Sequence, residues 1–76
     1  MCSLPAVTGQ QAVKAFSKLG FHVARTSGSH YIMKKDGHRY LLSVPVHTGQ
    51  TIKAGTLRGL IAAAGTTPEE FAKIVS

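Results

Sequence analysis

The Asp36-Gly37 dipeptide separates two runs of strand-forming residues, 29–35 and 38–44. Asp-Gly is favoured in two-residue type I′ turns, whose backbone twist matches that of the two strands in a β-hairpin. A turn of this length sets the register by counting, and it places Met33 opposite Tyr40 and Lys34 opposite Arg39. The sequence therefore predicts an antiparallel hairpin in the middle of the chain, around which the other elements have to pack.

Alternation of side chains along the two strands divides this hairpin into two faces. One face carries larger apolar and aromatic side chains, which we expect to pack against helices: Tyr31, Met33, Tyr40 and Leu42. The other face is apolar in the middle, basic at one end and carries a histidine at the other: His30, Ser43, Ile32, Leu41, Lys34 and Arg39. We expect this second face to stay exposed.

The first helix is predicted over residues 9–19. Thr8 and Gln11 form a capping-box pattern, and Ala12, Ala15, Phe16 and Leu19 follow at helical spacing. Gly20 is the expected helix-ending glycine. Residues 21–26 then alternate, with Phe21 and Val23 on one side, which is typical of a strand.

The second half of the chain predicts two more helices. Pro45 ends the third strand, and Thr56 is the expected N-cap of a helix over 56–64. Thr67 and Pro68 mark the start of a short last helix. Together these elements predict one α+β domain over residues 1–76, ordered α-β-β-β-α with a short C-terminal helix. Its three antiparallel strands and its helices form a two-layer sandwich like a double-stranded RNA-binding domain.

Charge indicates the kind of partner. Nine Lys and Arg residues stand against three acids, which gives a formal net charge of +6. A field of this sign attracts polyanions, so we expect the chain to bind nucleic acid, RNA foremost. A soluble protein with a merely solvated basic surface is the alternative. A membrane surface is disfavoured because the sequence has no basic amphipathic helix with exposed bulky apolar residues.

The location of the protein is predicted to be cytoplasmic. Cys2 is the single cysteine, so no internal disulfide can form, which is compatible with a reducing compartment. The first twenty residues lack the unbroken apolar core of a signal peptide. No run of residues approaches the roughly 20 apolar residues of a membrane span.

Four histidines, His22, His30, His38 and His47, are the side chains best suited to chemistry. Their spacing matches no zinc signature and acids are few, so we expect no metal and no cofactor. Cleavage of RNA by its own 2′-hydroxyl requires only a base, an acid and positive charge, which imidazole, Lys and Arg supply. His30 follows the small residues Ser27-Gly28-Ser29, which would allow a phosphate backbone to come close.

Two interpretations stay open when these residues are considered alone. His30 is either a proton-transfer group or an ordinary surface histidine at the start of a strand. Gly55-Thr56 at the start of a helix either binds a phosphate through backbone N–H groups or forms a plain helix cap.

An ordered set of short motifs resembles the HicA toxins of bacterial type II toxin–antitoxin systems. The set comprises Gly20-Phe21, Arg25, Gly28-Ser29-His30, Val44-Pro45-Val46-His47, Lys53-Ala54-Gly55-Thr56-Leu57 and Gly65-Thr66-Thr67 followed by Phe71. Three departures are visible. The residue after Gly20-Phe21 is often bulkier in the family, Gly65-Thr66-Thr67 stands where the family often has Gly-Ile-Ser, and the loop Thr48-Gly49-Gln50-Thr51 also varies. None of these departures involves His30.

The resemblance implies an endoribonuclease that cleaves mRNA independently of the ribosome, with His30 as the catalytic histidine. It also implies a HicB-type antitoxin, which we expect to cover His30. The Pro-x-His motif maps onto Pro45 and His47, whose role the resemblance leaves open. Expected RNA-binding residues are Arg25, Ser29, Lys34, Arg39, His47, Lys53 and Arg58. The alternatives are a non-cleaving RNA-binding module of similar fold and an inactive member that survives as a protein-binding partner or co-repressor.

Overall fold

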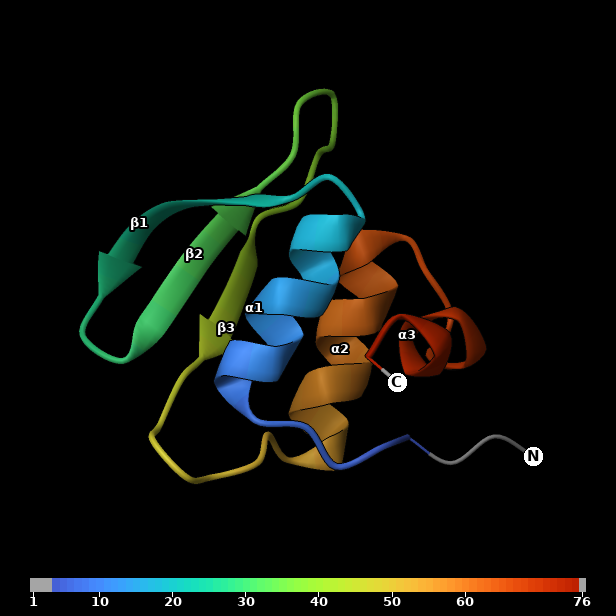
Figure 1. Ribbon diagram of the computed structural model, residues 1–76. Coiled ribbons are helices and arrows are strands. Elements are labelled where there is room, and N and C mark those ends of the chain that lie inside the picture. Colours follow the sequence, from blue (N-terminus) through green and yellow to red (C-terminus); the bar gives the residue numbers. More distant parts are fainter. Residues whose placement is uncertain (1–3, 76) are drawn as a thin grey trace.

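A three-stranded antiparallel sheet with helices on one side forms the body of the molecule (Figure 1). The structure is a computed structural model that describes residues 4–75, so Cys2 lies outside the described residues. The elements are α1 (Gly9–Lys18), β1 (His22–Ser27), β2 (His30–Lys34), β3 (Leu42–Pro45), α2 (Ala54–Ala64) and α3 (Pro68–Val75). This order, with strands arranged β1-β2-β3, confirms the predicted α+β architecture.

The start of α1 is held by the predicted capping box. The Thr8 hydroxyl accepts a hydrogen bond from the Gln11 backbone N–H at 3.2 Å, and the Gln11 side chain accepts one from the Thr8 N–H at 2.8 Å. Leu19 is the C-cap, and Gly20 follows with a φ of +100°. Local sequence therefore determines both ends of this helix.

The chain turns at Asp36-Gly37 as predicted, but it forms neither the predicted type I′ turn nor the predicted register. Met33 pairs with Leu42 and Tyr31 with Val44, so the predicted pairing is wrong by two residues. His38 N–H donates to the Lys35 carbonyl at 3.0 Å around Asp36-Gly37, but only Gly37 has a positive φ, of +78°. A type I′ turn needs positive φ at both central residues, and turns without it splay the strands. Pairing consequently starts only at Leu42, and residues 35–41 form a loop.

His38 holds this loop against the rest of the fold. Its Nε2 donates to the Ala63 carbonyl near the end of α2 at 2.6 Å, and its ring lies edge-on to Phe21 with centroids 5.1 Å apart. These contacts fix residues 35–41 against α2 and Phe21, away from the path of a longer β2–β3 ladder. The structural role of His38 thus explains part of the register error.

The observed register differs from the predicted one by two residues, so the paired side chains of β2 and β3 stay on their predicted faces. The residues near the turn, however, no longer belong to the sheet. Met33, Leu42 and Val44 are fully buried on the face toward the helices. Tyr40, expected to pack there, is instead 55% exposed in the loop. The ladder between β2 and β3 ends at Met33 and Leu42, so the predicted cross-strand pair of Lys34 and Arg39 does not form, and Lys34 pairs only with His22 of β1. Phe21 and Val23 were predicted on one side of the first strand. Phe21 is buried, but Val23 of β1 is 39% exposed, so the helices cover only part of that side.

The two remaining helices follow their local signals to different degrees. The N-cap of α2 is Lys53, not Thr56, which lies within the first turn of the helix. This part of the prediction is therefore wrong, although the helix ends at Ala64 as expected. In α3 the Thr67 hydroxyl accepts a hydrogen bond from the Glu70 N–H at 3.2 Å, which confirms the predicted cap.

Aromatic rings join α1, α3 and the sheet into one core. Phe16 is fully buried, and its ring centroid lies 5.1 Å from that of Phe71 and 6.3 Å from that of Phe21. Within residues 4–75 no helix is long and apolar enough to cross a membrane.

Candidate functional site

A cleft of about 360 Å³ opens where the start of β2, the end of β3, the loop 46–53 and the start of α2 meet. The side chains around it combine imidazole, ammonium, amide and hydroxyl groups. They are His30, Pro45, His47, Gln50, Thr51, Ile52, Lys53 and Thr56. Figure 1 shows this loop at the end of the sheet opposite the loop 35–41.

The loop 46–53 is held in place from two sides. On the sheet side, the Val46 N–H donates to the Ser29 carbonyl at 2.7 Å, which ties the loop to the residue before His30. On the helix side, the Ile52 N–H donates to the Val7 carbonyl at 2.8 Å, and Thr51 forms an isolated antiparallel bridge with Thr8. The cleft is therefore part of the folded framework and not a free-standing loop.

Gly9 permits this close approach between the start of α1 and the loop. A Cβ atom at Gly9 would collide with the Pro45 carbonyl and with Val46. Any side chain at this position would have to push the loop away, and with it the wall of the cleft. Gly9 thus supports the geometry of the site without lining it.

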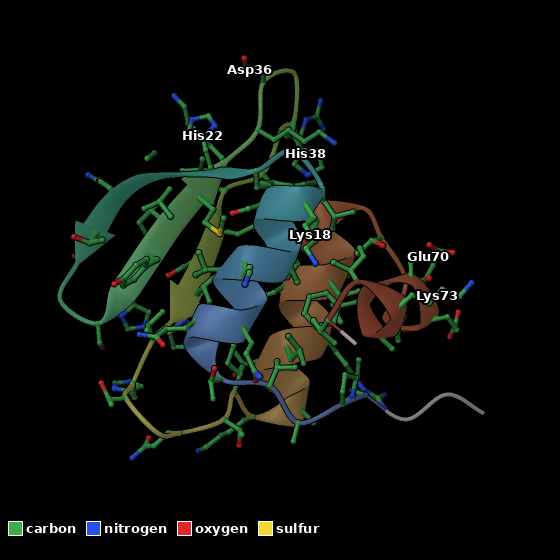
Figure 2. The ribbon with its side chains drawn as sticks, viewed as in Figure 1. Lys18, His22, Asp36, His38, Glu70 and Lys73 are labelled. Carbon is green, nitrogen blue, oxygen red and sulfur yellow. The ribbon has the colours of Figure 1, made fainter. Side chains whose placement is uncertain are left out.

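The cleft carries positive charge and no carboxylate. His30, His47 and Lys53 are exposed and line it. Of the acids, Asp36 lies in the loop at the far end of the molecule and Glu70 in α3, as Figure 2 shows, and Glu69 is also in α3. Anionic ligands are consequently favoured in the cleft, and the two imidazoles are the lining groups best suited to exchanging protons near neutral pH.

The start of α2 contributes to the same cleft. No side chain caps it, so N–H groups of its first turn remain available beside Lys53 and Thr56. The partial positive charge of a helix N-terminus adds to that of Lys53. Of the two interpretations of Gly55-Thr56, the plain helix cap by Thr56 is wrong.

Three of the predicted site residues line the cleft together: His30, His47 and Lys53. Ser29 is half-buried next to His30, with its carbonyl bonded to Val46. Gln50, Thr51 and Ile52 also line the cleft and were not predicted as site residues, although they lie between His47 and Lys53 in the chain. Thr56 was predicted only as part of a possible phosphate-binding helix start.

The other predicted RNA-binding residues lie outside the cleft. Arg25 is opposite Ile32, so it shares the open face of the sheet with His30 and Lys34. Lys34 is four residues along β2 from His30, roughly 13 Å at the usual rise of a strand. Arg39 lies in the loop 35–41, and Arg58 is exposed on α2 beyond the cleft.

The remaining histidines are separated from the cleft. Figure 2 shows His22 and His38 near the loop that carries Asp36, at the opposite end of the sheet. Within the described part of the chain, no group of three His, Cys, Asp or Glu side chains is arranged to hold a metal ion.

The family model described as "HicA toxin of bacterial toxin-antitoxin" matches residues 9–66, from the first residue of α1 to just beyond α2. The matched range includes the whole sheet and every residue that lines the cleft. A comparison with curated proteins gives no match.

Proposed function

Since the chain belongs to the HicA toxin family, whose members are mRNA-cleaving enzymes, we propose that it cleaves mRNA without the ribosome and uses His30 in proton transfer. The observation that carries this proposal is the cleft itself. It brings His30 together with a second imidazole and an ammonium group, with no carboxylate among its lining residues. These are the groups that cleavage by an internal hydroxyl requires.

The reaction is an internal transfer of the phosphoryl group. A base removes the proton of the 2′-hydroxyl, the 2′-oxygen forms a bond to phosphorus, and the bond from phosphorus to the 5′-oxygen breaks. An acid delivers a proton to that leaving oxygen. The products are a 2′,3′-cyclic phosphate and a 5′-hydroxyl, and no further reactant is consumed. His30 serves as the acid or the base because imidazole exchanges protons readily near neutral pH.

Positive charge in the cleft stabilises the transition state. Negative charge increases on the phosphoryl oxygens as the 2′-oxygen attacks, and fixed cationic groups lower the barrier most where they face that charge. Lys53 and the uncapped start of α2 are the groups in position to do so. Because these groups and the imidazoles supply what the reaction needs, we propose that cleavage is independent of metal ions.

Outside the cleft, the RNA backbone follows the open face of the sheet. Arg25 and Lys34 lie on this face with His30, and their charges suit phosphates on either side of the cleaved bond. Ser29, Arg39 and Arg58 are proposed as further contacts. In the observed register Lys34 and Arg39 act as separate phosphate contacts, because they do not face each other across the hairpin.

The first test is cleavage of RNA by the purified protein in the presence of a chelator. We expect cleavage to persist in EDTA and to leave 2′,3′-cyclic phosphate ends, which mass spectrometry identifies. Binding without cleavage would support the alternative of an RNA-binding module. Cleavage that disappears in EDTA and returns with a divalent cation would contradict the metal-independent mechanism.

The partner of the toxin is an antitoxin, as the family implies. We propose that the antitoxin covers the cleft and presents acidic side chains to it, because the toxin carries a formal net charge of +6. The half-buried Ile32, on the open face of the sheet with His30, offers apolar contact beside the cleft, whereas Leu41, 60% exposed, lies in the loop 35–41 at the other end of the sheet.

Chemical modification of histidines tests this arrangement. In the free toxin His30, His47 and His22 are exposed, so diethyl pyrocarbonate should modify all three. We expect the antitoxin to protect His30 and His47, while His22 at the far end of the sheet stays reactive and serves as the internal control. If cleavage is blocked while His30 remains as reactive as in the free toxin, the antitoxin does not act by covering the cleft.

A further inference from the structure

The proposed cleavage needs two proton transfers, and they occur at different oxygen atoms. One removes the proton from the 2′-oxygen and the other delivers a proton to the 5′-oxygen. A single imidazole cannot hold both positions at once, because the attacking and leaving oxygens lie on opposite sides of the phosphorus. A second proton-transfer group, or a water molecule in its place, must therefore stand near His30.

Among the described residues, few groups are in position for that role. The titratable side chains that line the cleft are His30, His47 and Lys53. The acids Asp36, Glu69 and Glu70 lie in the distant loop and in α3. An ordinary lysine ammonium keeps its proton at neutral pH and so supplies charge, whereas imidazole both accepts and gives protons there. This leaves His47.

The backbone holds His47 and His30 in a defined relation. His30 pairs directly with Pro45 across the sheet, and His47 is two residues beyond Pro45. The hydrogen bond from Val46 N–H to the Ser29 carbonyl, 2.7 Å long, joins the residues that precede the two histidines. On its other side, the His47 carbonyl accepts a hydrogen bond from the Gln50 N–H at 3.0 Å. The two imidazoles thus come from separate segments that are fixed to each other next to one cleft.

We infer that His47 is the second catalytic residue, and that His30 and His47 divide the two proton transfers between them. This inference rests on the proposed ribonuclease function. One imidazole takes the 2′-hydroxyl proton as the 2′-oxygen bonds to phosphorus. The other gives its proton to the 5′-oxygen as the bond between phosphorus and that oxygen breaks. His47, placed among the RNA-binding residues by the sequence analysis, then contacts the reacting atoms themselves.

Single-turnover cleavage measured across a range of pH tests the inference. A base and an acid acting together give a bell-shaped profile. We expect His47→Ala to lower the rate constant by about 10²–10⁴-fold and to remove one limb of the bell, and His30→Ala to remove the opposite limb. His47→Gln keeps a hydrogen-bonding group without proton transfer and should be as slow as His47→Ala. His22→Ala removes an exposed histidine far from the cleft and should keep both limbs of the profile.

An RNA with sulfur in place of the 5′-bridging oxygen identifies which histidine is the acid. A thiolate leaves without protonation, so this substrate should restore cleavage in the variant that lacks the acid and not in the one that lacks the base. Rescue of neither variant, or of both, would overturn the division of roles.

Failure of the inference is distinguishable from failure of the proposed function. If His30→Ala loses cleavage while His47→Ala or His47→Gln keeps the rate constant and both limbs, His47 is an RNA contact only. If the unmodified protein cleaves no RNA, the proposed function fails and the inference fails with it. Circular dichroism of each variant confirms the fold, which should be intact because the side chain of His47 is exposed.

Discussion

Replacing His30 with alanine is expected to lower RNA cleavage by about 10²–10⁴-fold, the usual effect of losing a proton-transfer group. The variant should fold normally, because His30 is exposed and its removal leaves no cavity in the core. It should still bind RNA, since Lys53 and the basic residues of the sheet face are unchanged. Expression of the variant should therefore not arrest growth, whereas expression of the unmodified toxin should.

Three measurements make this result interpretable. Cleavage gives the rate, fluorescence anisotropy with a labelled RNA gives affinity, and the unfolding midpoint gives stability. His22→Ala is the matched control, since it removes an exposed histidine from the opposite end of the sheet. A His30→Ala protein that binds and cleaves like the unmodified chain would remove His30 from the mechanism. If His30→Ala loses RNA affinity and cleavage to the same extent, His30 is a binding residue and not a proton-transfer group.

Replacing Phe16 with alanine is expected to destabilise the fold by about 3–5 kcal/mol. Phe16 is fully buried and its ring contacts both Phe21 and Phe71, so the truncated side chain leaves a cavity between α1, α3 and the start of the sheet. At the usual 0.05–0.15 kcal/mol per residue, a chain of this length has about 4–11 kcal/mol in total. The substitution should therefore remove a large part of the free energy of unfolding and leave a substantial fraction of the protein unfolded.

Denaturant unfolding followed by circular dichroism measures this effect. Tyr40→Ala is the control, because it also removes an aromatic ring but from a side chain that is 55% exposed. Because its ring contacts the His38 ring edge-on, with centroids 6.2 Å apart, its removal should lower the unfolding free energy by about 0.5–1.5 kcal/mol, well below the effect at Phe16. If Phe16→Ala unfolds at the same midpoint as the unmodified chain, the aromatic cluster is not the centre of the core. Unlike His30→Ala, the variant should lose activity through loss of folded protein.

The role of Phe71 shows that the core reaches beyond the matched range of the family. The family match ends at residue 66, yet Phe71 in α3 is fully buried against Phe16. The helix α3 begins at the cap formed by Thr67 and closes the core on the side of α1 away from the sheet. Residues after the matched range therefore belong to the same folded unit.

Helix ends that depend on neighbours in the sequence were predictable from the residues alone. The capping box of Thr8 and Gln11, the glycine after α1 and the Thr67 cap of α3 are each completed within three or four residues. On β2 and β3 the choice between inner and outer strand faces was also predictable, because a side-chain period of two survives an even shift in register. On β1 it was not, because an irregularity between Val23 and Arg25 puts Arg25 opposite Ile32 on the open face. Sequence motifs likewise indicated the family and singled out His30 before any fold was known.

Tertiary contacts decided the rest. The register of β2 and β3 depends on a turn with only one residue of positive φ and on the hydrogen bond from His38 to Ala63, which is 25 residues away in the chain. The cleft depends on hydrogen bonds from Val46 to Ser29 and from Ile52 to Val7, which join segments far apart in sequence. Local patterns contain no information about such partners, because the energy of each contact depends on residues that only the folded chain brings together. The sequence alone therefore determined which residues were chemically capable, and the tertiary structure determined which of them share a site.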